Sequence, residues 1–393
     1  MFKNFSQSKR LKIHLLIPNI FGFKGGVQVY SAFFLEALQE IYPFATIDVF
    51  LLHDTSQDIA SSQVSFLTDT RFHSFGKFKL SFRSWIYAFY LIAYGLFHRP
   101  DLIISTHLNF SVVAHRLNQI AGIPFWTIAH GVEAWDITRP DLKNALSKAQ
   151  KILAVSHYTC DRLIKEQELK SGKISLLHNT FQSKRFQPSP KPDQLLKKHS
   201  LHIRQPILLT VCRLCASESY KSYDVVLGAL PTILKTIPEA KYFIVGKGDD
   251  KSRLEKKIIE MDLQEHVILT GFVPDQDLCD YYNLCDVFVM PSKLEGFGIV
   301  YLEALACGKP VIGGNQDGAV DALSKGELGA LVDPDDAEEI AETVIQILNR
   351  TYPNYLMFQP NKLRSSVIER FGFTSFKRTL RNYLQTEIST LSS

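Results

Sequence analysis

The sequence is poor in cysteine. It holds 6 cysteines in 393 residues, and only Cys212 and Cys215 form a C-x-x-C pair. A chain of this length does not need disulfides to hold its core, and a single pair without a histidine cluster is a poor zinc site. We therefore expect reduced structural thiols, and neither a disulfide scaffold nor a zinc protein.

Long hydrophobic runs are also absent. The longest apolar run, residues 85–97 (WIYAFYLIAYGLF), is shorter than the roughly 20 residues of a membrane span. The first residues lack the apolar core of a signal peptide, so we expect a cytoplasmic protein, at most peripheral at the inner face of the membrane. For residues 85–97 we expect a buried helix. An interfacial helix is the alternative, because Arg83, His98 and Arg99 flank the aromatic residues.

Net charge is small but unevenly distributed. The chain carries 44 Lys and Arg against 40 Asp and Glu, or +4, which is too little for a dedicated nucleic-acid binder. Residues 1–200 hold 24 basic and 14 acidic residues, or +10, and the remainder holds 20 and 26, or −6. This excess predicts an anionic or membrane-borne partner for the first half, unless the lysines only aid solubility.

Short apolar runs alternate with helical patterns along most of the chain. This alternation is typical of an α/β protein whose parallel sheets are covered by helices on both faces, and the length suggests two such domains. The predicted strands are 13–17, 47–51, 102–105, 125–128 and 152–156 in the first half, and 207–211, 242–245, 267–270, 287–290, 310–312 and 330–332 in the second.

A segment rich in proline and lysine, residues 186–206, predicts an interdomain linker with the boundary near residue 195. We therefore expect one domain over 1–195 and a second over 196–370. The amphipathic segment 371–393 is predicted to be a helix that either closes the second domain or crosses back to the first.

Ligands of open α/β sheets bind beyond the carboxyl ends of the strands, and the residues that follow the predicted strands here are polar and glycine-rich. The most specific stretch is residues 291–314, PSKLEGFGIVYLEALACGKPVIGG. Its Gly296-Phe297-Gly298 opens a helix whose free N–H groups suit a diphosphate. Glu303 in this helix could accept ribose hydroxyls and Glu295 could hold a sugar, whereas the alternative is a solvated glutamate beside a glycine turn.

Two cations accompany this helix start. Arg213 directly follows a predicted strand, and Lys221 comes eight residues later before another helix. Cations at the same sheet edge as a phosphate-binding helix start would neutralise a departing nucleoside diphosphate. Their alternative interpretation is a pair of surface charges.

Through these motifs, the sequence resembles the retaining glycosyltransferases of family 4, which have the GT-B fold. The resemblance spans most of the chain: GFKGGVQVY, AHGVEAWD, AVSHYTCDRL, HNTFQSKRFQP, VCRLCASESYKSYD, YFIVGKGDDKSRLEKKI and EGFGIVYLE with its E-x7-E glutamates. It implies two doubly wound Rossmann-like parallel-sheet domains that face each other across a cleft, an acceptor-side domain over 1–195 and a nucleotide-sugar-binding domain over 196–370. With the basic excess of the first half, it also implies an anionic or membrane-borne acceptor such as a lipid-linked saccharide.

The resemblance also implies a role for each matching residue. Along the donor, it implies that Arg213 and Lys221 hold the donor diphosphate and that Glu303 contacts the ribose. It implies that the sugar is contacted by Glu295 and by the amides of Phe297 and Gly298. In the first half, it implies that Gly25 and Gly26 belong to a glycine loop that closes on the phosphates, and that His130 lies near the transferred sugar. Two motifs depart from the family pattern. Its common K-G reads Lys221-Ser222, and its hinge N-G-x-D reads Asn179-Thr180-Phe181-Gln182.

Other motifs carry less information. Gly246-Lys247-Gly248-Asp249 lacks the third glycine of a dinucleotide fingerprint. Asp333 and Asp335 form a D-x-D before a predicted helix, which helix capping explains better than a metal. His107 and His130 lack a third ligand, so we expect no metal site.

We therefore expect a retaining hexosyltransferase that uses a nucleotide-sugar donor, a saccharide or lipid-linked acceptor, and neither metal nor other cofactor. Its expected place is polysaccharide or glycolipid assembly. The alternatives are a nucleotide-sugar epimerase of the same fold and a non-catalytic nucleotide-sugar-binding protein. The sequence leaves the base, the sugar, the acceptor and the oligomeric state open.

Overall fold

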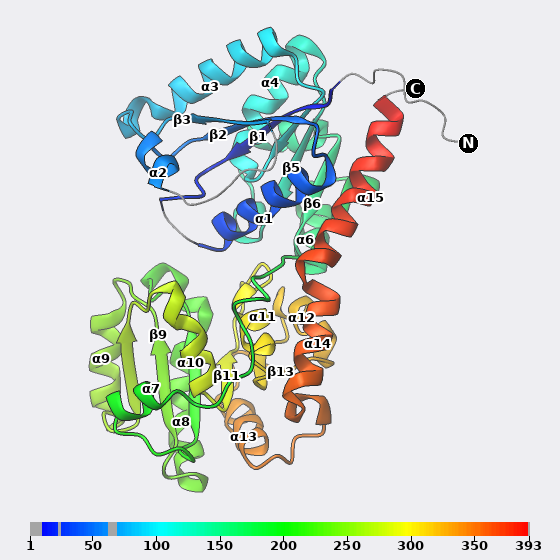
Figure 1. Ribbon diagram of the computed structural model, residues 1–393. Coiled ribbons are helices and arrows are strands. Elements are labelled where there is room, and N and C mark those ends of the chain that lie inside the picture. Colours follow the sequence, from blue (N-terminus) through cyan, green and yellow to red (C-terminus); the bar gives the residue numbers. More distant parts are fainter. Residues whose placement is uncertain (1–9, 23–24, 62–68, 392–393) are drawn as a thin grey trace. The chain divides into compact units, whose positions relative to one another are not determined.

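A computed structural model describes residues 10–22, 25–61 and 69–391. Contacts divide the chain into two compact units, shown in Figure 1. Unit 1 comprises the residues up to Asn179 together with those from Phe376 onward, and unit 2 comprises Thr180–Ser375. Each unit has its own parallel sheet, as the alternating pattern predicts.

Unit 1 holds a 7-stranded sheet in the order β3-β2-β1-β4-β5-β6-β7, with every pairing parallel. Its central strands are largely apolar and buried on both faces, as parallel strands under helices usually are, although β1 includes the buried His14 and β2 the buried Asp48. The strands are β1 (Lys12–Ile17), β2 (Thr46–Leu51), β3 (Asp69–Ser74), β4 (Leu102–Ser105), β5 (Phe125–Ala129), β6 (Lys151–Ala154) and β7 (Ile174–Leu176).

Helices cover both faces of this sheet, with α1 on one face and α3 and α4 on the other (Figure 1). They are α1 (Gly26–Ile41), α2 (Ser56–Ser61), α3 (Leu80–His98), α4 (Ser111–Ala121), α5 (Pro140–Lys148) and α6 (His157–Gln167). The chain's last helix, α15 (Phe373–Leu391), contributes its residues from Phe376 onward to unit 1.

Unit 2 holds a 6-stranded parallel sheet in the order β10-β9-β8-β11-β12-β13. From β8 the chain adds strands first on one side of the sheet (β9, β10) and then on the other (β11, β12, β13). The point between β8 and β11, where this order reverses, is the place at which such sheets bind ligands. The strands are β8 (Ile207–Val211), β9 (Lys241–Val245), β10 (Val267–Gly271), β11 (Val287–Met290), β12 (Val311–Gly314) and β13 (Ala330–Val332).

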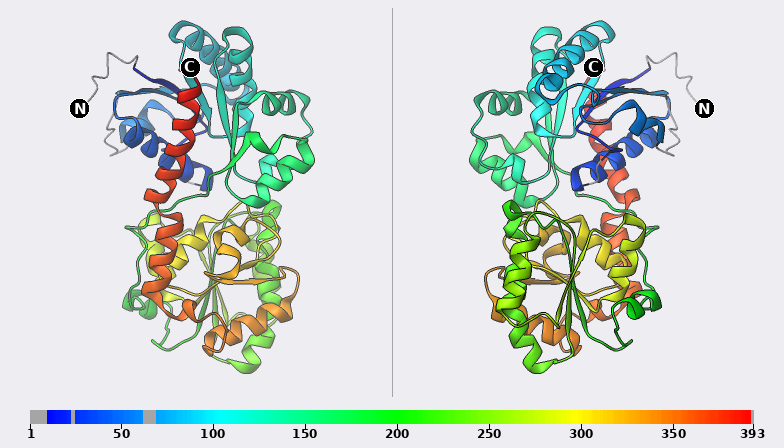
Figure 2. Two further views of the ribbon diagram at one scale, coloured as in Figure 1. Left: turned by 90° about the vertical axis from the view of Figure 1, so that its right-hand side faces the viewer. Right: turned by 90° about the vertical axis from the view of Figure 1, so that its left-hand side faces the viewer.

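Helices also cover both faces of the unit 2 sheet (Figure 2). Helices α8, α9 and α13 share one hydrophobic core, and α11 packs against α14 and α10. The helices are α7 (Asp193–Lys198), α8 (Tyr223–Thr236), α9 (Lys251–Glu260), α10 (Leu278–Leu284), α11 (Ile299–Ala306), α12 (Ala319–Ala322), α13 (Ala337–Leu348) and α14 (Pro360–Phe371).

The contact division falls between Asn179 and Thr180 rather than near residue 195. The predicted linker, 186–206, packs into unit 2, because polar groups tie it to the start of β11 and the end of α10. The Ser189 N–H donates to Asn283 Oδ1 at 2.9 Å, and Lys191 Nζ lies 2.7 Å from Asp286 Oδ2. In the contact division this segment, which includes the short helix α7, therefore belongs to unit 2.

The final helix, expected over 371–393, is α15 (Phe373–Leu391), and the contact division assigns most of it to unit 1. Its residues from Phe376 onward contact unit 1: the Tyr383 hydroxyl donates to the Leu176 carbonyl at 2.8 Å, and Glu387 lies 3.8 Å from Lys151 Nζ. Phe376 itself packs edge-on against Tyr30 of α1, with ring centroids 5.5 Å apart. Aromatic and polar contacts thus add this helix to the side of the unit 1 sheet that α1 covers.

The apolar run 85–97 lies in α3, and only one side of that helix is buried. Tyr87, Leu91 and Gly95 face the interior, whereas Trp85 and Phe97 are exposed. The expectation of a fully buried helix is therefore wrong for its outer side. Among the residues that the structure describes, no helix is long and apolar enough to cross a membrane.

Candidate active site

The loop that carries Arg213 is fixed by close backbone packing at the carboxyl edge of the unit 2 sheet. The Cys212 N–H donates to the Val245 carbonyl and the Leu214 N–H to the Lys247 carbonyl, at 3.0 and 3.1 Å. A Cβ at Gly246 would lie 1.8 Å from the Cys212 carbonyl oxygen, so that position requires glycine. The glycines of GKGD therefore permit two loops to touch, which explains them without a dinucleotide fingerprint.

Both predicted cations pair with carboxylates of the same unit. Arg213 is 65% exposed and forms an ion pair with Glu218, which lies in the short 3-10 helix η4 (Ala216–Lys221). Lys221, at the end of η4, is mostly buried and forms an ion pair with Glu295. The structure thus brings Lys221 and Glu295 together, and it leaves Arg213 more open to solvent.

The Lys221 ammonium is held in its charged form. Burial alone would lower its pKa, but Glu295 more than offsets this effect and the pKa of Lys221 is raised. The next residue, Ser222, is buried and adopts a left-handed conformation with φ 58°. Such a conformation favours glycine, which gives a physical reason for the K-G pattern that this chain departs from.

The backbone around Glu295 is clamped by a buried carboxylate. Asp317 accepts the Glu295 N–H at 2.6 Å and the Ala319 N–H at 2.9 Å, and the Gly318 N–H donates to the Glu295 carbonyl at 2.9 Å. Burial raises the pKa of Asp317 to about 7, although these N–H bonds favour its charged form. The loops after β11 and β12 therefore hold the Glu295 backbone in one place.

Helix α11 begins without a side-chain cap. Gly298, its first flanking residue, has φ 87°, and a Cβ there would lie 2.3 Å from the ring of Tyr301. Among the described residues, no acceptor is found for the amides of Gly298, Ile299 and Val300. Phe297 is buried and packs edge-on against Phe371 at 5.5 Å. The helix start therefore presents N–H groups beside the Lys221–Glu295 pair, in the arrangement that binds anions.

Glu303 lies one turn further along α11 and is mostly buried. The Tyr282 hydroxyl, from α10, donates to Glu303 Oε2 at 2.7 Å. Burial raises the pKa of Glu303 to about 7, and the Tyr282 hydrogen bond and the charge of Arg185 oppose that rise only in part. A carboxylate in this position keeps one oxygen available for hydroxyl donors.

In unit 1, His130 follows β5, and its backbone N–H donates to Glu133 Oε1 at 2.6 Å. Its Nε2 is 2.8 Å from the Thr106 carbonyl oxygen, and its ring packs edge-on against Tyr30 with centroids 4.8 Å apart. Burial lowers the pKa of His130 to about 4, although the Thr106 bond acts in the opposite direction. A neutral ring that donates from Nε2 to a carbonyl keeps Nδ1 as an acceptor.

The glycines of the predicted phosphate loop lie at the start of α1. Gly25 is the extended residue before the helix, and its carbonyl accepts the Val29 N–H at 3.0 Å. A Cβ at Gly26 would meet nothing within 4 Å. Residues 23–24 of this motif lie outside the described residues. Ser31, one turn along α1, donates to Thr106 Oγ1 at 2.9 Å, so α1 and the ends of β4 and β5 meet at one sheet edge.

The D-x-D motif precedes a helix, but neither of its aspartates is the helix cap that the sequence predicts. The cap of α13 is Asp336, whose side chain accepts the Glu338 and Glu339 N–H groups. Asp333 accepts the Asp335 N–H at 2.9 Å, and Asp335 pairs with Lys293. All six cysteines are free thiols, as predicted.

Sequence reasoning missed Glu218, Tyr282 and Asp317. Tyr282 and Asp317 support Glu303 and Glu295 from other segments of the chain, whereas Glu218 pairs with Arg213 within the VCRLCASESYKSYD motif. Two of the three carried a signal, because Glu218 lies in that motif and Asp317 lies in the glycine-rich loop 313–318 that follows a predicted strand. Tyr282 carried none.

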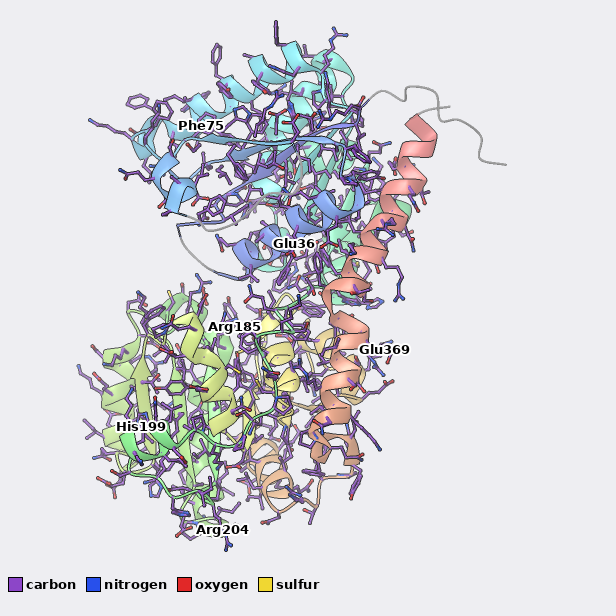
Figure 3. All side chains as sticks on the ribbon, in the orientation of Figure 1. Glu36, Phe75, Arg185, His199, Arg204 and Glu369 are labelled. Carbon is purple, nitrogen blue, oxygen red and sulfur yellow. The ribbon has the colours of Figure 1, made fainter. Side chains whose placement is uncertain are left out.

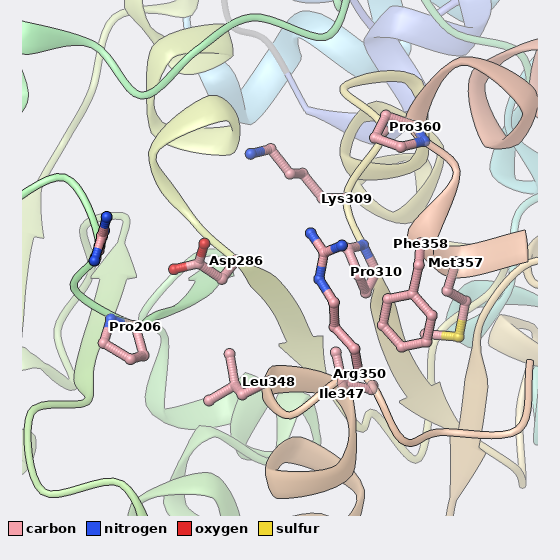
Figure 4. A pocket seen from close by; sticks show the side chains of 12 residues that line it. Pro206, Asp286, Lys309, Pro310, Ile347, Leu348, Arg350, Met357, Phe358 and Pro360 are labelled. Carbon is pink, nitrogen blue, oxygen red and sulfur yellow. The ribbon is translucent and has the colours of Figure 1, made fainter. Parts of the chain in front are cut away.

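A pocket of about 270 Å³ lies elsewhere in unit 2 (Figure 4). Pro206, Asp286 and Pro310 line it, and each directly precedes a strand. The pocket is therefore at the amino edge of the sheet, opposite the edge that carries Arg213 and Lys221. It does not belong to the candidate active site.

Solved structures share this fold over nearly the whole chain. The Anabaena protein HepE in complex with UDP superimposes with a TM-score of 0.78 at 18% identity, over 96% of this chain and 100% of that chain. Sucrose-phosphate synthase from Thermosynechococcus elongatus gives 0.77 at 21% identity, over 97% and 100%. The lipopolysaccharide outer core galactosyltransferase WaaB gives 0.71 at 18%, over 96% and 100%. The chain therefore has the GT-B fold of glycosyltransferases.

Two protein-family models match this chain, one in each half. Glycosyltransferase Family 4 matches residues 24–185, and Glycosyl transferases group 1 matches residues 193–364. The chain belongs to the family 4 type of glycosyltransferases, as its motifs predict.

Curated relatives match parts of the chain. A GDP-mannose-dependent alpha-(1-6)-phosphatidylinositol monomannoside mannosyltransferase from Mycolicibacterium smegmatis is 30% identical over 56% of this chain and 59% of its own length. The monoacylated-substrate counterpart from Corynebacterium glutamicum is 28% identical over 66% and 69%. Mannosylfructose-phosphate synthase from Agrobacterium fabrum is 25% identical over 50% and 44%. The chain thus spans less than two thirds of the first and third of these relatives.

Proposed function

We propose that this protein is a retaining glycosyltransferase that moves a hexose from a nucleoside-diphosphate sugar to an acceptor hydroxyl. One observation carries the proposal: the buried Lys221–Glu295 ion pair lies beside the uncapped start of α11. A cation and free amides suit a diphosphate leaving group, and a carboxylate next to them suits the sugar, on which positive charge develops.

In the proposed reaction the bond between the anomeric carbon and the diphosphate oxygen breaks. Lys221, Arg213 and the amides of α11 stabilise the negative charge that gathers on the departing phosphate. The acceptor hydroxyl forms its bond on the same face of the sugar and gives its proton to that phosphate oxygen. This assignment uses the protein's own cations for charge stabilisation, and it includes neither a metal nor another cofactor.

Glu303 is proposed to accept ribose hydroxyls. Its partner Tyr282 occupies one carboxylate oxygen at 2.7 Å and fixes its orientation. Gly25 and Gly26 are proposed to let the start of α1 approach the phosphates, because neither carries a side chain. His130 is proposed to contact the transferred sugar through a neutral ring, which its lowered pKa favours.

The acceptor is proposed to be a glycolipid or a growing polysaccharide. Two observations support this choice: residues 1–200 carry a net charge of +10, and two of the relatives are named for phosphatidylinositol mannosides. An enzyme with such an acceptor would act at the cytoplasmic face of a membrane.

The test is incubation of the purified protein with labelled UDP- and GDP-sugars, with and without a membrane lipid extract. The proposal expects nucleotide release from one donor, a labelled glycolipid or saccharide product, and an anomeric configuration, read by NMR, that matches the donor's. An inverted product would refute the retaining step. Donor binding without any turnover would favour a binding protein, and an isomerised donor without transfer would favour an epimerase.

A variant pair controls for contaminating enzymes. The Lys221→Ala, Arg213→Ala double variant should bind donor poorly and release no nucleotide. Lys377→Ala is the matched control, because it also removes a lysine from a lysine–glutamate pair, here with Glu40. It should stay active, since this pair has no proposed role in the reaction.

A further inference from the structure

Helix α3 in unit 1 has an unusual distribution of side chains. Its outer side carries Phe82, Trp85, Phe89 and Phe97, which are 63%, 79%, 77% and 85% exposed. Their spacing places them along one side of the helix together with Leu96, which is 37% exposed. Figure 3 shows side chains standing out from the outer side of α3.

Besides its buried side with Tyr87 and Leu91, α3 has a flank that carries polar groups. The Tyr94 hydroxyl donates to Asp48 Oδ1 at 2.9 Å, and the Tyr90 hydroxyl lies 3.1 Å from His73 Nδ1. His98 stacks on Tyr94 with ring centroids 3.7 Å apart. A surface helix normally buries its largest apolar residues and exposes its polar ones. This helix buries Tyr87 and Leu91 but also leaves four large aromatic side chains exposed, so its outer side is suited to an apolar neighbour.

Most of the charged residues near α3 are basic, apart from Asp48, which accepts the Tyr94 hydroxyl, and Asp101. Residues 71–100 contain five Lys or Arg and no Asp or Glu, and Asp101 is the one acidic residue between positions 71 and 132. Lys77 and Lys79 are exposed at the N-terminus of the helix, where the helix dipole disfavours cations, and the first turn has no acidic residue. Cations in this position gain nothing from the helix, but they would gain from an anionic neighbour.

We propose that α3 docks this protein onto an anionic lipid bilayer, with its outer aromatic residues in the interfacial layer and its flanking cations against the headgroups. Phenylalanine and tryptophan on one side with lysine and arginine beside them is the composition of helices that lie in a membrane interface. A second copy of the chain fits less well, because pairing two such helices would bring like charges together. The proposal does not depend on the transfer reaction.

Trp85 provides a direct readout, because it is the exposed tryptophan. The other two, Trp126 and Trp135, are 0% and 6% exposed. The experiment titrates the full chain with vesicles of phosphatidylcholine alone, or of two parts phosphatidylcholine to one part phosphatidylglycerol, and records tryptophan emission and flotation. We expect a blue shift and co-flotation with the anionic vesicles, and weaker binding when salt is added.

Two triple variants, both of which retain Trp85, test the surface. Phe82→Ser, Phe89→Ser, Phe97→Ser should lower the vesicle-bound fraction about tenfold or more, because it removes apolar area from the interface. The matched control Phe44→Ser, Ile203→Ser, Ile259→Ser removes exposed apolar side chains from other elements and should bind as the parent does. Circular dichroism establishes that each variant is folded.

The charges are tested by Lys77→Gln, Lys79→Gln, which should weaken binding to anionic vesicles severalfold and leave the weak binding to neutral vesicles unchanged. Vesicle binding by the α3 triple variant equal to the parent's would overturn the proposal. Sedimentation that shows a dimer in the parent but not in that variant, without vesicle binding by either, would also overturn it and assign α3 to self-association. None of these measurements uses donor sugar, so failure here is separate from failure of the proposed transferase.

Discussion

The carboxyl edges of the two sheets use different chemistry. In unit 2 the loops after β8 and β11 carry two cation–carboxylate pairs, Arg213–Glu218 and Lys221–Glu295. At the corresponding edge of unit 1, Ser31 of α1, Thr106 and His130 present neutral side chains, and Glu133 accepts the His130 N–H. The same strand-loop-helix architecture therefore produces one edge with two cations, which can neutralise a diphosphate, and one whose neutral side chains can hold hydroxyl groups without adding positive charge.

Two units with the same type of fold therefore differ in the charged side chains at their carboxyl edges, and we expect this difference to decide which ligand group each edge binds. A paired and mostly buried cation such as Lys221 is already oriented when a ligand arrives, because Glu295 holds it in place. A neutral histidine contributes hydrogen bonds of modest strength and does not compete for the diphosphate. Substitutions in each edge should therefore fail in different ways.

The largest effect is expected at Lys221. Its charge should matter most as the leaving phosphate gathers negative charge, so Lys221→Ala should lower kcat by about a hundredfold or more. Lys221→Arg should recover part of that loss, because it keeps the charge and changes the geometry. Arg213→Ala, whose parent side chain is more exposed, should lose less than Lys221→Ala. A double variant with near-parental kcat would refute the leaving-group role.

The two glutamates of unit 2 should separate kcat from KM. Glu295→Ala should lower kcat by about tenfold or more, because its carboxylate adjoins developing positive charge, and Glu303→Ala should mainly raise the donor KM. Steady-state kinetics with the identified donor measures both, and Glu255→Ala on the surface of α9 serves as the control. Identical defects in the two variants would mean that both glutamates only support the helix.

The neutral edge of unit 1 should respond to acid through stability. His130 has a pKa of about 4 in the folded protein against 6.5 ordinarily, so the unfolded chain binds more protons between these values. The free energy of unfolding should therefore fall as pH drops from 7 to 5, by about 1–2 kcal/mol from this residue. His130→Gln should lose that much less in urea titrations at the two pH values. Equal losses in parent and variant would contradict the buried neutral histidine.

A smaller effect is expected at Ser222, which is left-handed at φ 58°. Ser222→Gly relieves the steric cost of that conformation and should raise the free energy of unfolding by about 0.5–1 kcal/mol. Thermal denaturation measures the change. Ser222→Ala, which keeps a Cβ, should not stabilise the protein, and a stabilised alanine variant would place the cause elsewhere.

No effect is expected from chelation. Because the proposed charge stabilisation comes from Lys221, Arg213 and backbone amides, transfer in excess EDTA should equal transfer in buffer. Loss of activity that manganese restores would show that the charged edge of unit 2 needs a cation from outside the protein, and it would return Asp333 and Asp335 to consideration as ligands.

Most of the fold could be predicted because parallel strands buried on both faces are continuous apolar runs. All six strands of unit 2 lie where the sequence pattern predicts them, within one or two residues. The pattern missed β3 and β7, the two edge strands of unit 1. Asp69–Ser74 (DTRFHS) is polar and half-exposed, and Ile174–Leu176 has three residues, so their strand structure comes from pairing with β2 and β6.

The candidate site was predictable in its charges but not in its pairings. Arg213, Lys221, Glu295 and Glu303 stand out because they follow strands or lie in a glycine-bounded helix. That Lys221 pairs with Glu295, 74 residues away, depends on the contact between the loops after β8 and β11, where the Lys293 N–H donates to the Tyr220 carbonyl at 3.0 Å. Tertiary contacts of this kind leave no local pattern in the sequence.

Arg364 of α14 sets a condition for engineering this protein. Its guanidinium donates to the Ser183, Phe186 and Ala306 carbonyls, all within unit 2, so one side chain joins the first segment of that unit, the end of α11 and α14. Grafting the donor half onto another acceptor half should therefore use junctions near 180 and 375. A graft cut at 195 would remove the Ser183 and Phe186 carbonyls, which accept two of the three hydrogen bonds of Arg364. The grafted unit would then hold α14 less firmly.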